Sequence, residues 1–552
     1  MFARTNRRLC NPVFIAPRNS NGIRAFSLMS SHPPHDAERT LLATSLVDAD
    51  EPLADQVADA GRRGADIVEL RVDRIGDVGA VEELLRAPRC VPLILTVRTA
   101  DEGGAWDGEE AERIALVERL GLLGPGYVDV EWASWRRSAN LRQKVGLVCE
   151  RSDRLGGDRP LNKLILSHHD LRGTPEDLDA VAEPLAAEPA AVAKLVFTAR
   201  DATDALRVLC MLHRYAQRRP TIALAMGEPG LATRVLAPKF GGFLSFASRG
   251  VGRESAPGQP TLEELRGVYR WDEINPATGV YGVVGWPVHH SRSPYIHNAA
   301  LRESAIDAVY LPFPVAPTPA AFERFMRAAI APELDIRGLS VTLPHKVHAL
   351  RWLRDAGGVL DEHATRCGAV NTLVRGEGGR WSGHNTDVVG ALRALEHCAG
   401  LDAARLRGEQ TVVLGAGGVA RAVTYALVSA GAKVTIYNRT RARSEALAAE
   451  FGCRWGEWDQ RTTARGRLLA NCTSIGMDSA AGETPMPADA LRAFDVVFDT
   501  IYTPKETQLL RDAVRQGVGV VDGVTMFVEQ AARQFELWHD RSAPIEVFRT
   551  RV

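Results

Sequence analysis

The sequence has 552 residues, enough for two or more domains. Its hydrophobic content of 45% and charged content of 24% are ordinary for globular proteins. The net charge of -1 argues against a nucleic-acid or acidic-membrane partner, and no apolar run is long enough to span a membrane. We therefore expect small-molecule ligands, and the sequence leaves the oligomeric state open.

Residues 1–38 form an N-terminal extension whose composition differs from the rest. Five arginines precede the first acidic residue, Asp36. An organelle transit peptide has this composition, and so does an upstream extension of a bacterial reading frame. We expect a disordered segment and a cytoplasmic protein, or a plastid protein if the segment is a transit peptide.

Residues 39–273 contain eight apolar, β-branched runs that alternate with helix-like segments. The runs are 41–46, 65–72, 91–97, 127–132, 163–168, 191–197, 221–226 and 243–247. The helical patterns include 52–63, 109–123, 175–187 and 201–218. This alternation predicts an α/β fold with a (β/α)8 TIM barrel, and an open doubly wound sheet is the alternative.

Polar residues lie at the ends of five successive predicted strands, where a TIM barrel carries its chemistry. The residues are Glu69, Arg71, Asp73, Arg98, Glu102, Asp129, Glu131, His168, His169, Asp170 and Lys194. Lys194 lies in an apolar run, so it is either an edge-strand residue with a solvated amine or a buried amine that burial shifts toward the neutral, nucleophilic form. A lysine with a histidine suits imine formation and proton abstraction beside a carbonyl.

Anion binding is predicted for three arginines, Arg71, Arg98 and Arg234, which can hold a substrate carboxylate. We expect no metal site. His168 and His169 are adjacent on a strand and point to opposite faces, so they cannot share one ion.

Several stretches between residues 65 and 273 resemble type I 3-dehydroquinate dehydratase. They are Glu69-Leu70-Arg71-Val72-Asp73, Thr96-Val97-Arg98, Glu102-Gly103-Gly104, Ser167-His168-His169-Asp170, Lys194, Met226-Gly227 with Arg234, and Ser255-Ala256-Pro257-Gly258-Gln259. The resemblance implies that Lys194 forms a Schiff base with the substrate ketone and that His169 transfers the protons. The other pocket residues it implies are Ser45, Glu69, Arg71, Arg98, Arg234, Ser255 and Gln259. The family usually has an aromatic residue at the position of His168.

A second half begins after a predicted short linker at 275–279. Residues 411–421 predict a strand, a turn with the pattern Gly415-x-Gly417-x-x-Ala420, and a helix, followed by a second strand at 433–437. This arrangement is the dinucleotide fingerprint, in which backbone N–H groups approach a pyrophosphate. The residues of the predicted turn are Gly415, Ala416, Gly417, Gly418 and Val419. Further strand-like runs at 467–472, 495–501 and 518–522 complete a Rossmann-like sheet.

The residues after the second strand favour NADP(H) over NAD. An acidic residue there would bind the ribose hydroxyl of NAD, whereas this chain has Asn438, Arg439, Thr440 and Arg443. Arginine matches the extra phosphate of NADP as a planar fork. The alternative is a solvent-facing basic loop.

Short polar motifs lie ahead of this region. They are Ser291-Arg292-Ser293-Pro294, Ser340-Val341-Thr342-Leu343-Pro344-His345-Lys346, Gly368-Ala369-Val370-Asn371-Thr372 and His384-Asn385-Thr386-Asp387. Each alone is typical of capping or turn chemistry. Together with the dinucleotide fingerprint they resemble shikimate dehydrogenase over about 280–552.

The resemblance implies a substrate-binding domain at 279–395 and a Rossmann NADP-binding domain at 396–552 whose C-terminal helices return to the substrate domain. It further implies that Lys346 and Asp387 form the catalytic pair and that Ser291 and Ser293 bind the substrate carboxylate. The other residues it implies are Thr342, Asn371 and Gln530 at the ring hydroxyls, and Tyr502 and Gly523 near the nicotinamide. Single-domain members usually carry asparagine at the position of Ser340, whereas fused dehydratase–dehydrogenases share the domain order and this serine.

Both resemblances together imply a bifunctional enzyme of aromatic amino-acid biosynthesis. It would dehydrate 3-dehydroquinate and reduce the product to shikimate with NADPH. A catabolic NAD-linked quinate/shikimate dehydrogenase is one alternative, against which Arg439 and Arg443 argue. A non-catalytic quinate-sensing regulator is another. The presence of Lys194, His169, Lys346 and Asp387 argues against it.

Overall fold

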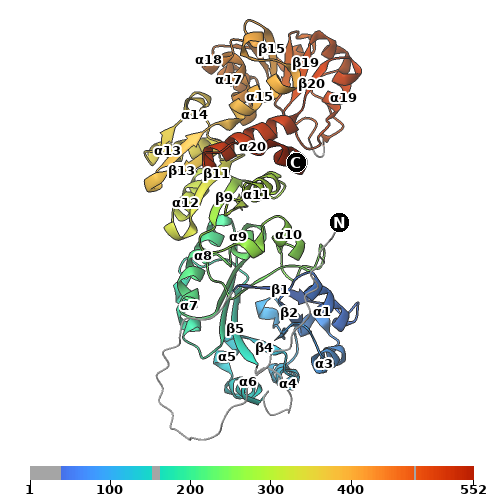
Figure 1. Cartoon of the computed structure of the whole chain (residues 1–552), viewed down its shortest axis with the longest axis vertical. Helices are drawn as coiled ribbons and strands as arrows, with labels where there is room; N and C mark the ends of the chain where they lie inside the picture. Colours follow the sequence, from blue (N-terminus) through green and yellow to red (C-terminus); the bar gives the residue numbers. More distant parts are fainter. Residues whose placement is uncertain (1–38, 152–161, 478–479) are drawn as a thin grey trace, which may run out of the picture. The chain divides into compact units, whose positions relative to one another are not determined.

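The computed structural model describes residues 39–151, 162–477 and 480–552 (Figure 1). The predicted extension at 1–38 lies outside these residues. The described residues form three sheets, one in each predicted domain. None of the helices in the described ranges has both the length and the apolar character needed to span a bilayer.

Eight parallel strands build the first sheet (Figure 1). They are β1 (Leu41–Leu46), β2 (Ile67–Arg71), β3 (Leu93–Thr96), β4 (Gly126–Glu131), β5 (Lys163–Asp170), β6 (Val192–Thr198), β7 (Thr221–Met226) and β8 (Leu244–Phe246). Their order is β7-β6-β5-β4-β3-β2-β1-β8, and the backbone N–H of Phe243 donates to Thr221 O at 2.8 Å across the remaining gap. This consecutive order is that of a nearly closed barrel and not of a doubly wound sheet, so the predicted barrel is confirmed.

The barrel helices follow the predicted segments. They are α1 (Leu53–Arg62), α2 (Val72–Ile75), α3 (Val78–Arg86), α4 (Glu110–Gly121), α5 (Trp132–Arg137), α6 (Ala139–Arg151), α7 (Asp179–Ala186), α8 (Ala202–Ala216), α9 (Leu231–Val235) and α10 (Leu262–Gly267), with 3-10 turns at η1 (Ala100–Glu102), η2 (Glu228–Gly230) and η3 (Trp271–Glu273). Helix α8 begins where the Asp201 side chain accepts from Thr203 N–H, and its apolar stripe is buried.

The barrel interior changes from apolar to polar along the strands. Ile67, Ile94 and Ile165 belong to an apolar cluster, and two residues further along the same strands stand Glu69, Thr96 and Ser167. Side chains two apart on a strand share a face, so the polar residues lie above the apolar layer, toward the C-terminal ends of the strands. The alternation in the sequence therefore places the charged groups inside the barrel.

The second sheet is mixed, in the order β10-β9-β11-β13-β14-β12. Its strands are β9 (Gly279–Gly285), β10 (Ala308–Pro314), β11 (Ile336–Val341), β12 (Val359–Leu360), β13 (Thr372–Arg375) and β14 (Trp381–His384). The helical segments of this region are α11 (Ser293–Glu303), α12 (Pro319–Ala329), η4 (Pro332–Leu334), α13 (Lys346–Asp355), α14 (Glu362–Cys367) and η5 (Glu377–Gly379).

The third sheet is fully parallel, in the order β17-β16-β15-β18-β19-β20. Its strands are β15 (Gln410–Leu414), β16 (Lys433–Tyr437), β17 (Arg454–Gly456), β18 (Leu468–Asn471), β19 (Val496–Asp499) and β20 (Gly519–Val521). The associated helical segments are α15 (Thr386–Ala399), α16 (Ala403–Leu406), α17 (Gly418–Ser429), α18 (Arg441–Phe451), η6 (Trp458–Thr463), η8 (Ala488–Ala493), α19 (Gln508–Arg515), α20 (Gly523–His539) and α21 (Ile545–Arg551). This is the Rossmann order, with the switch point between β15 and β18.

Helix α20 leads the chain back from the third sheet to the second. The Trp538 indole N–H donates to Leu373 O at 3.1 Å, and Phe535 belongs to an apolar cluster with residues of β9, β10 and α11. The boundaries 39–273, 279–395 and 396–552 stay predictions.

Candidate active sites

The first candidate site lies inside the barrel around Lys194. This side chain is only 4% exposed, and its Nζ lies 2.8 Å from Asp129 Oδ2 and 3.5 Å from Glu69 Oε1. The amine is therefore not the solvated amine of an edge strand. Two carboxylates lie beside the amine, which has to be deprotonated before it can act as a nucleophile.

The two carboxylates beside Lys194 stay ionised. Burial alone would raise the pKa of Asp129, but Arg98 and Lys194 outweigh it and hold the pKa well below its usual range. Burial also works to raise the pKa of Glu69, and Lys194 with Arg71 more than offsets it. From the sequence, Asp129 was placed at a strand end but given no role. Asp129 and Glu131 are two residues apart on β4 and therefore share a face of the strand, which could have indicated that both point into the barrel.

His169 is oriented by Glu102. Oε2 of Glu102 lies 3.1 Å from the backbone nitrogen of His169 and 2.9 Å from its Nδ1. Burial, followed by Arg98 and Lys194, holds the pKa of His169 well below its usual value, so the ring is neutral. When Glu102 accepts from Nδ1–H, Nε2 keeps its lone pair and can act as a base.

The pKa of Glu102 is itself perturbed. Burial raises it to about 7, with Arg98 opposing and Glu131 and Asp129 adding to the rise. Sequence reasoning did not assign Glu102 to the histidine, because the two residues are 67 positions apart. The neighbouring His168 lies on the other face, against the rings of Trp132 and Phe197, as predicted.

Two of the three arginines predicted to bind an anion already form ion pairs with carboxylates of the protein. Arg71 forms a bidentate pair with Asp73, at 3.0 and 2.8 Å. Arg98 donates to Asp129 at 2.9 Å and to Ser167 at 2.7 Å. Their charges are therefore largely compensated before any ligand binds.

Arg234 differs from these two arginines. It is 2% exposed, donates to Phe246 O at 3.3 Å, and has no ion pair or Nε partner among the described residues. Burial lowers its pKa to about 10. A buried cation without an anion is costly, so Arg234 marks the place in the barrel best suited to an anionic ligand.

The loop after β8 reaches the same site. The Ser45 hydroxyl donates to Glu69 at 2.6 Å and lies 3.2 Å from the Ser255 hydroxyl. Oε1 of Gln259 accepts from the Ser255 backbone N–H at 2.9 Å. The structure therefore connects Ser45, Glu69, Ser255 and Gln259 in one network that ends at Lys194.

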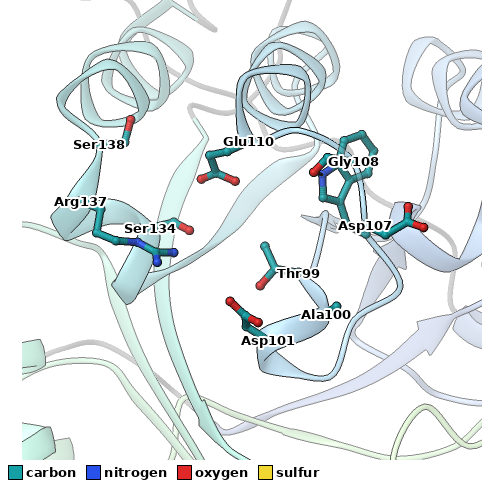
Figure 2. Close-up of a pocket in the computed structure, with 10 residues that line it drawn as sticks. Thr99, Ala100, Asp101, Asp107, Gly108, Glu110, Ser134, Arg137 and Ser138 are labelled. Carbon is teal, nitrogen blue, oxygen red and sulfur yellow. Dashed lines mark hydrogen bonds between the residues drawn. The ribbon is translucent and has the colours of Figure 1, made fainter.

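A different cavity of about 370 Å³ opens beside the loop that follows Arg98 (Figure 2). Figure 2 shows Asp101, Glu110 and Arg137 around it. Glu110 is already paired with Arg113. This cavity contains none of the predicted site residues, so it is not the candidate site.

The second candidate site centres on Lys346 and Asp387. Nζ of Lys346 lies 2.6 Å from Asp387 Oδ2, and both side chains are largely buried. Lys346 is the first residue of α13, and Asp387 lies in the first turn of α15. A Cβ on Gly418, at the start of α17, would lie 3.8 Å from Cδ of Lys346, so the glycine turn borders this pair.

The predicted substrate contacts lie on several elements. Ser291 and Ser293 flank the start of α11, where the Ser291 hydroxyl accepts from the Ser293 N–H at 3.3 Å. This helix start suits a carboxylate, since α11 has no acidic residue in its first turn. The Asn371 amide bonds to Thr386, one residue before Asp387, at 3.0 Å.

The other three predicted residues, Thr342, Gln530 and Tyr502, are described by their local contacts. Thr342 directly follows β11 and is partly exposed. The Gln530 amide donates to Phe527 O at 3.0 Å, within its own helix, and is not linked to the Lys346 pair by a hydrogen bond. The Tyr502 ring stacks on Phe527 with 4.6 Å between centroids.

The glycine turn after β15 can accept a dinucleotide. Gly415 has φ 110°, and a Cβ there would lie 2.8 Å from Cys472 O, so this position needs glycine. Nothing lies within 4 Å of a Cβ built on Gly417, which leaves open space beside the N-terminus of α17. Ala416 and Val419 complete the turn at a helix start without acidic residues, where a pyrophosphate is favoured.

The loop after β16 offers exposed positive charge. Arg439 and Arg443 are exposed and have no ion pair with any residue that the structure describes. Arg441 is occupied, since it pairs with Glu457 at 3.1 Å and lies over the Trp455 ring. The remaining residues fix the loop, where the Asn438 amide donates to Thr440 O at 2.9 Å.

Gly523 is explained by packing. A Cβ there would lie 2.2 Å from Ile501 O, so glycine lets the start of α20 approach the end of β19. The position adjoins the loop with Tyr502, and the predicted place of both residues near a nicotinamide stays a prediction.

Family comparisons cover both halves of the chain. Residues 43–276 match type I 3-dehydroquinase, and residues 283–373 match the shikimate dehydrogenase substrate binding domain. Residues 398–463 match shikimate/quinate 5-dehydrogenase, and residues 523–552 match the shikimate 5'-dehydrogenase C-terminal domain.

Individual proteins are similar to the whole chain or to its second half. The chain is 35% identical over 529 residues to the chloroplastic bifunctional 3-dehydroquinate dehydratase/shikimate dehydrogenase of Arabidopsis thaliana, covering 92% of this chain and 83% of that protein. It is 42% identical over 274 residues to a shikimate dehydrogenase (NADP(+)) of Halobacterium salinarum, covering 49% of this chain and 97% of that protein. The solved shikimate 5-dehydrogenase of Thermus thermophilus, in complex with NADP(H) and shikimate, is 33% identical with a TM-score of 0.44, covering 50% of this chain and 98% of that one.

Proposed function

Because this chain belongs to the bifunctional 3-dehydroquinate dehydratase/shikimate dehydrogenase family, we propose how its residues carry out two consecutive reactions. The chain is an enzyme with both activities and acts in the shikimate pathway. The first reaction dehydrates 3-dehydroquinate, and the second reduces the resulting 3-dehydroshikimate to shikimate. The product of the barrel is thus the substrate of the second site.

In the barrel, Lys194 loses a proton and its Nζ attacks the ketone carbon of 3-dehydroquinate. The carbinolamine expels water to give a protonated Schiff base. Nε2 of His169 removes a proton from the carbon next to the imine, and the electron pair moves to the imine nitrogen as an enamine. The enamine then expels the hydroxyl group, which His169 protonates to water, and hydrolysis frees Lys194 and 3-dehydroshikimate. The partly buried contact between His169 and Glu102 supports this role.

The substrate is held by the groups around Lys194. Arg234 binds the carboxylate, which supplies the anion that this buried cation lacks among the described residues. The hydroxyl groups contact the polar network of the barrel, which comprises Ser45, Glu69, Arg71, Arg98, Ser255 and Gln259. Because Arg71 and Arg98 are already paired with carboxylates, their main contributions are the positive electrostatic potential of the site and the orientation of their carboxylate partners.

In the second half, Lys346 donates a proton to the substrate oxygen as it becomes an alkoxide, and Asp387 holds the lysine in place. Ser291 and Ser293 bind the carboxylate at the start of α11. Thr342, Asn371 and Gln530 bind the ring hydroxyls, and Tyr502 and Gly523 would contact the nicotinamide end of the cofactor.

The cofactor of this proposal is NADP(H), which supplies the hydride when bound. The turn formed by Gly415, Ala416, Gly417, Gly418 and Val419 would hold its pyrophosphate. The loop formed by Asn438, Arg439, Thr440 and Arg443 would hold its 2'-phosphate. The open space at Gly417 supports this choice, and so do Arg439 and Arg443, which are exposed and form no ion pair with a described residue.

The observation that carries the proposal is the presence of two groups: buried Lys194 and Asp129 beside partly buried His169 and Glu102 in the barrel, and the Lys346 pair in the second half. The test is to give purified protein 3-dehydroquinate and NADPH and to follow both absorbance changes. We expect the enone of 3-dehydroshikimate to rise and then fall as one NADPH is oxidised per shikimate formed. Enone that accumulates with no NADPH oxidation would contradict the second half of the proposal. Location in the cytoplasm, or in a plastid if residues 1–38 are a transit peptide, stays a prediction.

A further inference from the structure

A series of buried hydrogen bonds leads from β10 to Asn371 and Thr386, the residue before Asp387. The Tyr310 hydroxyl on β10 donates to Ser340 Oγ on β11 at 2.7 Å. The Ser340 hydroxyl donates to Gln534 Oε1 on α20 at 2.8 Å. All three side chains are buried, so water does not compete for these bonds.

The series continues to Asn371, a residue of the proposed substrate site. The Gln534 amide donates to Thr372 Oγ1 at 3.0 Å, and the Thr372 hydroxyl donates to Asn371 Oδ1 at 2.8 Å. Oδ1 of Asn371 also accepts from the Thr386 backbone N–H at 2.8 Å. Because both lone pairs of Oδ1 are used, Asn371 can offer a ligand only an N–H donor.

The orientation of the Gln534 amide, in the middle of these hydrogen bonds, sets the direction of the others. Nε2 of Gln534 also faces the backbone carbonyl of Asn371 at 3.3 Å, so a flipped amide would place two oxygens together. Oε1 must then face Ser340, which has to donate to it and therefore accepts from Tyr310. Burial raises the pKa of Tyr310, with hydrogen bonds to Ser340 and Ser293 opposing, so the phenol stays protonated and remains a donor.

The surroundings of Tyr310 keep it fixed. Its ring stacks on the buried His297 with 4.4 Å between centroids and 12° between planes. Burial lowers the pKa of His297 to about 3, so this ring stays neutral. Tyr310 also touches both parts of the proposed site, since Ser293 belongs to the carboxylate subsite and Ser340 leads to Asn371.

We propose that Tyr310 and Gln534 are positioning residues of the dehydrogenase reaction. They act through Ser340 and Thr372 to hold the Asn371 amide with its N–H toward the substrate. The inference rests on the proposed role of Asn371 and adds two residues that do not need to touch the substrate. A serine at position 340 is short enough to join the tyrosine to the glutamine.

The test is Tyr310→Phe, which removes the donor and keeps the stacked ring. We expect the KM for shikimate to rise roughly tenfold, as for the loss of one hydrogen bond, with kcat within about twofold. The KM for NADP+ and the dehydratase activity of the same chain stay unchanged. The matched control is Tyr281→Phe on the adjacent strand β9, since this buried tyrosine packs on Trp538 and belongs to no part of the series of bonds; it should leave every constant unchanged.

A double-mutant cycle separates positioning from general destabilisation. Ser340→Ala should raise the same KM, and adding Tyr310→Phe to it should have little further effect, because the link is already broken. An unchanged KM in Tyr310→Phe overturns the inference, as do parallel losses of kcat, thermal stability and dehydratase activity. An unchanged KM in Asn371→Ala overturns the site assignment itself, and the inference with it.

Discussion

Asp129 joins Lys194 to Arg98 inside the barrel. Its Oδ2 accepts from the Lys194 amine at 2.8 Å, while its Oδ1 accepts from Arg98 at 2.9 Å and from Ser167 at 2.6 Å. One buried carboxylate thus serves two buried cations. The position of the nucleophile and the charge balance of the site depend on the same residue.

Asp129→Asn should destabilise the protein by about 3 kcal/mol, because it leaves two buried cations with one carboxylate fewer. Urea unfolding measures this loss. The control is Asp170→Asn, whose partner Arg172 is 91% exposed, so it should cost well under 1 kcal/mol. Equal losses in the free energy of unfolding would show that the buried pairs of Asp129 stabilise the protein no more than the exposed pair of Asp170.

The dehydratase rate should fall as pH drops through about 7, the pKa of Glu102. Above this pH the ionised carboxylate accepts from His169 Nδ1–H and leaves Nε2 as the base, and below it the carboxylic acid no longer does so. The pH profile of kcat/KM checks this, with the dehydrogenase activity of the same chain as the reference. Glu102→Gln should be slower and lose this transition. If the variant keeps the transition, another group causes it.

Lys346→Ala should lower the dehydrogenase kcat by about 100-fold or more with little change in the KM for shikimate, because the lysine acts on the charge that develops in the transition state. Steady-state kinetics with NADP+ and shikimate measure both constants. Lys433→Ala, at the exposed start of β16, is the control and should have no effect. A rise in KM at unchanged kcat would make Lys346 a binding residue only.

Arg439→Ala should raise the KM for NADPH by roughly tenfold and leave the weak use of NADH nearly unchanged. The reason is that Arg439 has no protein anion among the described residues and faces the proposed 2'-phosphate. Arg441→Ala is the matched control, since Arg441 already pairs with Glu457. Equal efficiencies with NADPH and NADH in the unmodified protein would favour the NAD-linked alternative.

The sequence predicted the strands and the positions of the charged residues well, because side chains two apart on a barrel strand share a face. It could not predict the pairings. The partner of Arg98 depends on the register of β3 against β4, and the contact between Glu102 and His169 spans 67 residues. Nor could it show that, of the three barrel arginines, Arg71 and Arg98 have carboxylate partners whereas Arg234 has none among the described residues. The link from Ser340 to Gln534 spans 194 residues and required the packing of α20 on the second sheet.

The central claim is that the Lys194 amine condenses with the ketone of 3-dehydroquinate. Borohydride reduction in the presence of substrate, followed by peptide mass spectrometry, tests it most directly. We expect the reduced adduct on Lys194, and we expect Lys194→Ala to give no adduct and no dehydration while its dehydrogenase activity persists. An adduct on Lys163, or full dehydratase activity in Lys194→Ala, would contradict the account.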